Sequence, residues 1–275
     1  MTEAPKHRQR DQDTLTWQRE VWDKAAKVYV EGVEPRFAPI VNGMLRRAKL
    51  RSGERVLDVG CGTGAVTVRA AAAAGSSGRV DAIDISEEML RLARGRVADS
   101  ALANVTFHIA GAEALPLPNH CVDAVLAGMS LMFVPERAAA AREIARVLRP
   151  GGRLVAAFPS GPETCDLVKF QRILGAFAPE PPRKGVGPGS MADPEPFVRS
   201  LAESGIAATV EREECDFEFA DLQEAWDIFA HVTAMRMSPE RRGEARAEVF
   251  RQMWPAGDGP RRFHNVIHFL VGKRT

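Results

Sequence analysis

The sequence is poor in cysteine: it has 4 in 275 residues, and no C-x-x-C pair occurs. Wide spacing of this kind argues against a zinc knuckle or a redox dithiol, and we expect no metal site. No apolar run approaches the roughly 20 residues that a membrane span requires. The first residues, MTEAPKHRQRDQD, are polar where a signal peptide would be apolar. These absences predict a reduced, cytoplasmic chain that does not insert into a membrane.

An excess of charge of either sign is also lacking, since 37 basic residues face 36 acidic ones. Without a net field, binding to nucleic acid or to an anionic membrane surface is not expected. A small molecule is therefore the expected partner, and the oligomeric state is left open. The chain is 45% hydrophobic and long enough for one sizeable core with an appendage. We expect a single domain over residues 1–275.

Strand-like and helix-like patterns alternate between residues 55 and 158, which is typical of an α/β fold with a parallel sheet and crossover helices. Two amphipathic helices, at 17–29 and 36–49, precede this region, and we define residues 14–49 as an N-terminal helical cover. Ser86 is suited to cap a helix that begins with Glu87 and Glu88. The core covers residues 52–160, and its strands are expected at 55–59, 79–84, 104–109, 122–127 and 152–158.

A glycine turn follows the first of these strands in RVLDVGCGTGAV, residues 55–66. Glycines between a strand and a helix allow a ligand to approach the backbone closely, because no Cβ stands in the way. However, Gly60, Gly62 and Ala65 also satisfy the loose dinucleotide pattern G-x-G-x-x-G/A. The glycines alone therefore do not distinguish a nicotinamide cofactor from another adenosine ligand.

Two aspartates at strand ends narrow the choice of ligand. Asp58 stands two residues before Gly60, where its carboxylate can hold the loop and face a positive charge on a ligand. A diphosphate would be disfavoured at such a site. Asp84 ends the strand at 79–84 and can accept hydrogen bonds from both hydroxyls of an adenosine ribose.

Four stretches in this order, VLDVGCGTG, DAIDISEEML, GAEALPLPNHCVDAVLA and EIARVLRPGGRLVAAF, resemble the class I S-adenosylmethionine-dependent methyltransferases. The resemblance covers residues 55–158 and is nearest to the small-molecule branch that includes the ubiquinone and menaquinone biosynthesis enzymes. It implies a Rossmann-like, seven-stranded sheet with an antiparallel last strand and S-adenosylmethionine as the cofactor. It also implies methyl transfer to oxygen or carbon of a small, apolar or aromatic metabolite, as in secondary metabolite biosynthesis.

Two other classes of function stay open at this point. The fold can be recruited to a reaction without methyl transfer, such as a cyclisation in secondary metabolism, because the motifs specify the cofactor better than the acceptor. A ligand-binding subunit without catalytic activity is the third possibility. Release of S-adenosylhomocysteine together with a methylated product separates the first class from the other two.

The resemblance also assigns cofactor-binding positions in this sequence. Gly111 departs from the family pattern, which commonly has an aspartate there to accept from the adenine amino group, and Glu113 or water is expected to substitute. Tyr29, in the cover, is expected either to fold over the cofactor or simply to pack on the sheet. Met89 has ordinary helix-to-sheet packing as an equal alternative, and Asp58 joins the site by its place before the turn. The other implied contacts are Gly60, Cys61, Gly62 and Gly64 around the methionine moiety, Asp84 at the ribose, and Ile85, Met89 and Ala112 around the adenine.

Catalytic candidates come from the C-terminal part, where residues 208–219 and 261–273 are predicted as two further strands. An antiparallel last strand begins at the ligand-binding edge of the sheet, which would bring His264 near the mouth and leave His268 deeper. His231, on a predicted helix, competes with His264 for a role as general base, with packing beside Trp226 and Phe229 as the alternative.

Residues 161–205 and 221–255 are expected to cap the substrate. The loop at 179–192 is rich in proline and glycine and is predicted either to gate the acceptor, with Arg183 and Lys184 open to trypsin, or to be a plain linker. The apolar residues of the caps form either an inner surface for the acceptor or a core of their own: Phe170, Phe177, Trp226, Phe229, Met235 and Met237.

Overall fold

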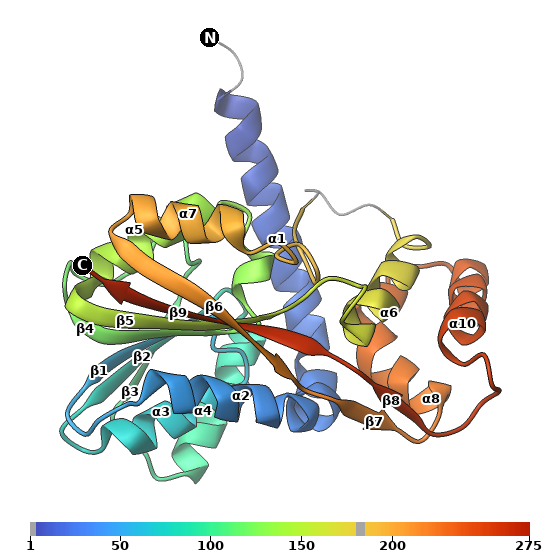
Figure 1. Cartoon of the computed structure of the whole chain (residues 1–275), viewed down its shortest axis with the longest axis horizontal. Coiled ribbons are helices and arrows are strands. Elements are labelled where there is room, and N and C mark those ends of the chain that lie inside the picture. Colours follow the sequence, from blue (N-terminus) through green and yellow to red (C-terminus); the bar gives the residue numbers. More distant parts are fainter. Residues whose placement is uncertain (1–3, 180–184) are drawn as a thin grey trace.

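The structure is a computed structural model that describes residues 4–179 and 185–275, with side chains from Thr14 onward. Its centre is a seven-stranded sheet with the order β3-β2-β1-β4-β5-β9-β6 (Figure 1). β9 runs antiparallel to both of its neighbours and the other pairings are parallel, which confirms the predicted Rossmann-like topology. The strands are β1 (Arg55–Val59), β2 (Arg79–Asp84), β3 (Val105–Ile109), β4 (Val122–Gly128), β5 (Leu148–Pro159), β6 (Ile206–Glu214) and β9 (Val266–Arg274).

Helices cover both faces of this sheet. α2 (Glu34–Ala48), α3 (Ala65–Ala74) and α4 (Glu87–Asp99) lie on one face, and α5 (Arg137–Val147) and α7 (Glu195–Glu203) lie on the other (Figure 1). The expected cap of α4 is confirmed, since the Ser86 hydroxyl accepts a hydrogen bond from the Met89 amide at 3.1 Å. The central strands are buried on both faces, which is typical of parallel sheets.

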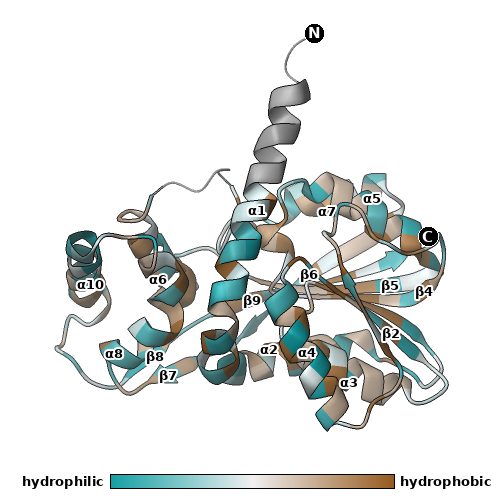
Figure 2. Ribbon diagram, turned by 180° about the vertical axis from the view of Figure 1, so that it is seen from behind, coloured by the Kyte–Doolittle hydropathy of each residue, from teal (hydrophilic) through white to brown (hydrophobic). Residues whose placement is uncertain are grey.

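The N-terminal cover is one bent helical run rather than the two separate helices predicted. α1 (Ala4–Val28) continues through a π-helical turn, η1 (Tyr29–Val33), directly into α2. Pro35, directly after this turn, lacks the N–H group that a regular α-helical hydrogen bond to Glu31 needs, which accounts for irregular hydrogen bonding at this point. The bend lets α1 cross between the sheet and the C-terminal cap (Figure 2).

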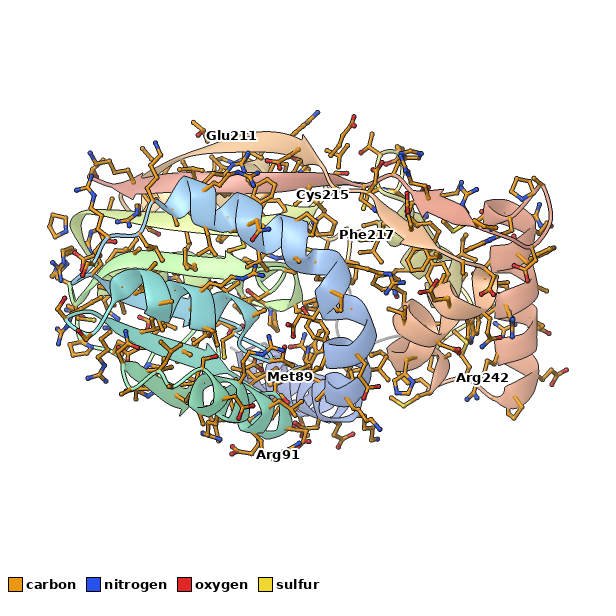
Figure 3. The ribbon with its side chains drawn as sticks, turned by 90° about the horizontal axis from the view of Figure 1, so that it is seen from below. Met89, Arg91, Glu211, Cys215, Phe217 and Arg242 are labelled. Carbon is orange, nitrogen blue, oxygen red and sulfur yellow. The ribbon has the colours of Figure 1, made fainter. Side chains whose placement is uncertain are left out.

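The two predicted C-terminal strands are each broken in two, which corrects the sequence prediction. β6 ends at Glu214 before β7 (Phe217–Phe219), and β8 (Arg261–Phe263) ends before β9. Asn265 sits in the break, where its side-chain amide donates to the carbonyls of Cys215 and Phe263. β7 and β8 then pair as a separate two-stranded sheet that reaches into the cap, with Cys215 and Phe217 along the path (Figure 3).

The cap is built from this small sheet and short helices around an aromatic core. Ring centroids of Phe219 and Phe263 lie 4.7 Å apart, and those of Phe170 and Phe263 lie 5.9 Å apart.

Among the described residues, no helix has the length and apolar character needed to cross a membrane. The remaining helical elements are η2 (Leu131–Phe133), α6 (Asp166–Gly175), α8 (Leu222–Ala225), η3 (Trp226–Ala230), α9 (His231–Ala234) and α10 (Pro239–Met253).

Candidate cofactor and acceptor site

A cavity of about 670 Å³ opens where the carboxyl ends of β1, β2 and β4 meet the cover and the cap. β1 pairs with β2 on one side and β4 on the other, so this edge is the topological switch point of the sheet. The cavity volume is within the usual range for small-molecule sites. Its floor comes from the core loops and its roof from α1, η1 and the cap.

The glycine turn forms part of the floor through Gly60 and Gly62. Gly60 has φ +66°, and a Cβ at this position would lie 2.4 Å from the Cβ of Ser130. Ser130 is held in that position because its hydroxyl donates to the Val59 carbonyl at 2.7 Å. The close approach leaves the loop backbone, rather than a side chain, facing the cavity.

Two other predicted loop residues are not on the cavity wall. Cys61 packs behind the loop against Ala82 and Leu90. Gly64, at the N-terminus of α3, faces α4, where an added Cβ would lie 3.1 Å from the Cβ of Ala93. Cys61 and Gly64 therefore help to shape the turn by packing against its neighbours, and neither presents a side chain to the cavity.

Asp58 lies beneath the loop, off the cavity wall, and is 1% exposed. Its Oδ2 accepts a hydrogen bond from the Thr67 hydroxyl at 2.6 Å, whereas Oδ1 is buried with no partner among the described residues. Burial, followed by repulsion from Asp84, raises the pKa of Asp58 to about 7. An unpartnered, buried carboxylate oxygen beside a ligand loop fits a site for a cation such as an ammonium group.

Asp84 lines the cavity at the end of β2, as predicted. Its Oδ2 accepts from the Gly62 amide at 2.8 Å, and its Oδ1 accepts from the Ser86 amide at 2.9 Å. Burial raises the pKa of this carboxyl group. Each carboxylate oxygen can accept a second hydrogen bond, so the two amides fix the group without using all of its acceptor capacity.

The predicted adenine-binding residues meet at one end of the cavity. Ile85, Met89, Gly111, Ala112 and Glu113 all line it. Met89 is buried, next to α1 (Figure 3). The carboxylate of Glu113 lies over Gly111, because a Cβ on Gly111 would be 3.0 Å from Glu113 Oε2. A carboxylate is thus present beside the position where the family pattern has aspartate.

The N-terminal cover closes this end through two acidic residues that the sequence analysis missed. Asp23 accepts a hydrogen bond from the Ser86 hydroxyl at 2.5 Å. Glu34 accepts from the Thr63 hydroxyl at 2.7 Å and from Arg96 at 2.5 Å. Helical periodicity identifies the buried face of the cover but carries no signal for such polar contacts.

Tyr29 lines the cavity from η1, as predicted. Burial, with the nearby carboxylates of Glu34 and Asp84, raises the pKa of its hydroxyl, so the phenol stays protonated. The rest of the cover's lining surface is mainly apolar and comprises Leu15, Trp17, Gln18, Val21, Trp22, Ala25, Val28, Val33 and Phe37.

The cap forms the other end of the cavity, where Phe229 is the one member of the predicted apolar set on the wall. Phe170 and Met237 are buried in the cap and Met235 is exposed. For Phe170, Trp226 and Met237, the alternative of a core within the cap is therefore the better description. The wall is instead completed by Leu167, Val168, Gln171, Arg172, Ile228, His231, Val232, Thr233 and Arg236.

The structure separates the two candidate histidines. His231 lines the cavity at the start of α9. His264 does not line it: the side chain is exposed in the break between β8 and β9, with Nδ1 3.1 Å from Asp216 Oδ2. The expectation that His264 lies at the mouth is wrong, because the chain leaves the main sheet at Asn265 and turns the side chain outward. His268 is buried, and its ring centroid lies 5.7 Å from that of Phe158.

Part of the glycine-rich loop also reaches the cavity, through residues 186–189. Arg137 holds this part by donating to the Gly185 carbonyl at 2.7 Å and to the Ser190 hydroxyl at 2.6 Å. Arg183 and Lys184 lie outside the described residues, so the gating role of the loop stays a prediction.

Comparison with known proteins identifies the family. The family described as "Methyltransferase domain" matches residues 56–152. Nocamycin O-methyltransferase of Saccharothrix syringae is 30% identical over 279 residues, which cover 92% of this chain and 97% of that protein. The chain belongs to the class I S-adenosylmethionine-dependent methyltransferases. Its cofactor is S-adenosylmethionine, and its acceptor is a small molecule.

Two further matches place this methyltransferase among its relatives. The ubiquinone/menaquinone biosynthesis C-methyltransferase UbiE of Yersinia enterocolitica is 41% identical over 107 residues, which span 38% of this chain and 43% of that protein. The crystal structure of the [4+2]-cyclase SpnF matches with a TM-score of 0.58 and 24% identity, over 86% of this chain and 80% of that one. The structural match shows a shared fold.

Proposed function

We propose that this methyltransferase methylates an oxygen of a small, apolar or aromatic metabolite of secondary metabolism. The observation that carries the proposal is the continuous cavity, which joins the adenosine-type end at Asp84 to an apolar compartment under the cap. The similarity to an O-methyltransferase over nearly the whole chain supports oxygen as the attacked atom.

The described residues fit S-adenosylmethionine. Asp84 would accept from the ribose hydroxyls, Glu113 would accept from the adenine amino group, and the backbone of Ala112 would bind the adenine edge. The unpartnered Oδ1 of Asp58, under the glycine turn, supports binding of the methionine ammonium group in this region. When bound, the cofactor would supply a methyl group on a positively charged sulfonium sulfur, from which a neutral thioether is a good leaving group.

The chain's own part in the reaction is to align the acceptor and to exclude water. Trp17, Trp22 and Val21 of α1 cover the cavity, and Phe229 and Val232 line it from the cap. His231 is the histidine on the acceptor wall, and we place it next to the acceptor's polar group. There it would take the proton of a hydroxyl acceptor or donate a hydrogen bond to an ionised one.

Incubation of the protein with S-adenosylmethionine and a panel of phenols, hydroxylated apolar compounds and carboxylic acids tests the proposal. We expect a product with one added methyl group in a 1:1 ratio to released S-adenosylhomocysteine, measured by mass spectrometry. A transformed product without S-adenosylhomocysteine would instead favour a reaction such as cyclisation. Cofactor binding with neither product from acceptors that bind would favour a ligand-binding role.

A further inference from the structure

Two side-chain amides line the cavity among the residues that the structure describes. Gln18 comes from α1 of the N-terminal cover, and Gln171 comes from α6 of the cap. An amide set in an apolar wall needs a partner, because an unpaired polar group away from water costs free energy. The rest of the wall that these two helices supply is largely apolar and includes Leu15, Trp17, Val21, Trp22, Leu167 and Val168.

Gln18 is held in one orientation and is only 3% exposed. Its Nε2 donates a hydrogen bond to the Phe133 carbonyl at 2.7 Å. A backbone carbonyl can only accept, so this contact fixes the nitrogen toward Phe133 and decides which way the amide faces. The amide oxygen of Gln18 makes no hydrogen bond with any described residue, and the side chain lines the cavity. The oxygen is therefore a fixed acceptor that a ligand can use.

Gln171 is held in the same manner on the cap. Its Nε2 donates to the Phe229 carbonyl at 2.7 Å, and its oxygen accepts from the Thr233 hydroxyl at 3.4 Å. The second contact is long for a bond between two oxygens, and the amide oxygen keeps a further lone pair. His231 begins α9 and lies on the same wall. The cap thus offers uncharged polar groups to an acceptor hydroxyl beside His231.

The position of Gln18 along α1 assigns it to the acceptor side of the cover. Asp23 accepts from the Ser86 hydroxyl at the adenosine end. Trp17, next to Gln18 in the chain, lies 4.8 Å from the guanidinium of Arg236 in the cap. Helix rise places Gln18 about 7.5 Å from Asp23 along the axis, in the direction of the cap. An acceptor that extends from the cap to the cover can therefore reach the Gln18 oxygen.

We propose that the acceptor carries a second hydroxyl group, besides the one that is methylated, and that this second hydroxyl donates a hydrogen bond to the oxygen of Gln18. The inference rests on the proposed function and narrows its substrates to polyhydroxylated aromatic or alicyclic compounds. An ether at the second position has no hydrogen to donate and would leave the Gln18 oxygen unpaired in apolar surroundings. The wall therefore discriminates against an ether there.

Dihydroxynaphthalenes and their methyl ethers test this preference on one apolar body. The 1,3-, 1,6- and 2,7-isomers supply three spacings between the hydroxyls. In a monomethyl ether, the remaining hydroxyl must occupy the methylation site to react, which turns the ether toward Gln18. We expect kcat/KM for the best diol to exceed that for its monomethyl ether about tenfold or more, the scale of leaving a buried acceptor unpaired.

Binding provides a second readout that does not depend on turnover. Calorimetry with saturating S-adenosylhomocysteine gives the dissociation constants of each diol and its dimethyl ether. Gln18→Met should weaken the diol about tenfold and change the dimethyl ether less than about twofold, and it should bring the two kcat/KM values within about threefold. Loss of the Phe133 contact alone would weaken diol and ether alike, so the ratio isolates the role of the oxygen.

Gln223→Met is the matched control. Gln223 is exposed on α8, donates to Asp227 at 2.7 Å and does not line the cavity. This variant should keep the wild-type preference for the diol in both readouts.

Equal affinity for diol and dimethyl ether at all three spacings would overturn the proposal, as would no binding of any diol. A Gln18→Met variant that weakens diol and ether alike, or that loses S-adenosylhomocysteine affinity instead, would also overturn it. Methyl transfer at equal kcat/KM to diol and monomethyl ether rejects the second hydroxyl and leaves the proposed function standing. A preference for the diol that depends on Gln18, without release of S-adenosylhomocysteine from any diol, rejects the proposed function instead.

Discussion

Glu113 holds Oε2 over Gly111, 3.0 Å from where a Cβ of Gly111 would lie. The family pattern places an aspartate at position 111, and in this chain the carboxylate comes instead from Glu113, two residues later in the sequence. Glu113→Ala should weaken S-adenosylhomocysteine binding by about 1–2 kcal/mol through loss of a hydrogen bond to a charged acceptor. Calorimetry on the folded variant measures this change.

Placing a carboxylate at position 111, where the family pattern has aspartate, should restore affinity for S-adenosylhomocysteine. Gly111→Asp in the Glu113→Ala background should recover most of the lost affinity, whereas Gly111→Asp alone should weaken binding because two carboxylates then crowd one site. Failure of the double variant to bind better than Glu113→Ala would show that Glu113 does not take the place of the family aspartate.

Asp84→Ala should weaken S-adenosylhomocysteine binding by at least about 1.5 kcal/mol. The loss has two sources, because Asp84 is proposed to bind the ribose and also accepts the amides of Gly62 and Ser86. Circular dichroism checks that the variant is folded, and Asp99→Ala, at the exposed end of α4, serves as the control. Equal affinities of the Asp84→Ala and Asp99→Ala proteins would remove Asp84 from the cofactor site.

Asp58 should make the stability of the cofactor-free protein depend on pH. Its pKa is about 7 in the folded protein against an ordinary value of 3.8, so between these values the folded state holds a proton that the unfolded state releases. The free energy of unfolding should therefore fall as pH rises from about 4 to about 7, by up to about 4 kcal/mol, and then level off.

Asp58→Asn removes the titrating group while keeping a side-chain acceptor for Thr67. Urea unfolding at about pH 5 and about pH 8 should show that the substitution is more favourable, or less damaging, at the higher pH. Parallel pH profiles for the two proteins would mean that Asp58 is ionised throughout in the folded state.

His231→Ala should lower kcat/KM for methyl transfer about tenfold or more, with S-adenosylhomocysteine affinity changed less than about twofold, because the residue lies on the acceptor wall. His264→Ala should leave both quantities unchanged, since that side chain is exposed beside Asp216. Initial rates and calorimetry on the two variants make the comparison. Loss of activity in His264→Ala with normal His231→Ala would reverse the assignment.

The sheet could be predicted from the sequence because β1, β2, β3 and β4 are short strands bounded by turn residues, whereas β5 begins four residues before its predicted start. β1 and β2 start and end where the sequence predicts. The breaks at Cys215 and Asn265 escaped prediction because they depend on a pairing between distant segments, in which one asparagine bonds to both strands. The π-helical turn at Tyr29–Val33 likewise has no clear periodic signal.

The cofactor end was easier to predict than the acceptor end for a physical reason. Asp84, Met89 and Glu113 follow strand ends within a continuous motif region, so local order fixes where they lie. His264 was misplaced because a strand assumed to be continuous turns away before it reaches the mouth. Arg236 was missed because an arginine in the turn after a short helix looks like any solvated charge, until the fold places its guanidinium over the Trp17 ring.

The N-terminal cover contacts the cap through Gly32 and Ile228, which lie in two facing π-helical turns, η1 and η3. A Cβ on Gly32 would lie 2.7 Å from Ile228 Cγ1. Gly32→Ala should therefore force the cover and cap apart and destabilise the protein by about 1–3 kcal/mol, measured by urea unfolding. We expect weaker acceptor binding as well, because both turns line the cavity.

Ile228→Ala should relieve that contact, so the double variant should be more stable than the sum of the two single changes predicts, with a coupling of about 1 kcal/mol or more. Gly95→Ala is the control, since it adds the same methyl group to an open position of α4 and should be neutral or stabilising. If the changes in the free energy of unfolding were strictly additive, the contact between Gly32 and Ile228 would accommodate the added methyl group without strain. The cover would then be free to lift from the cap independently, which the close contact at Gly32 argues against.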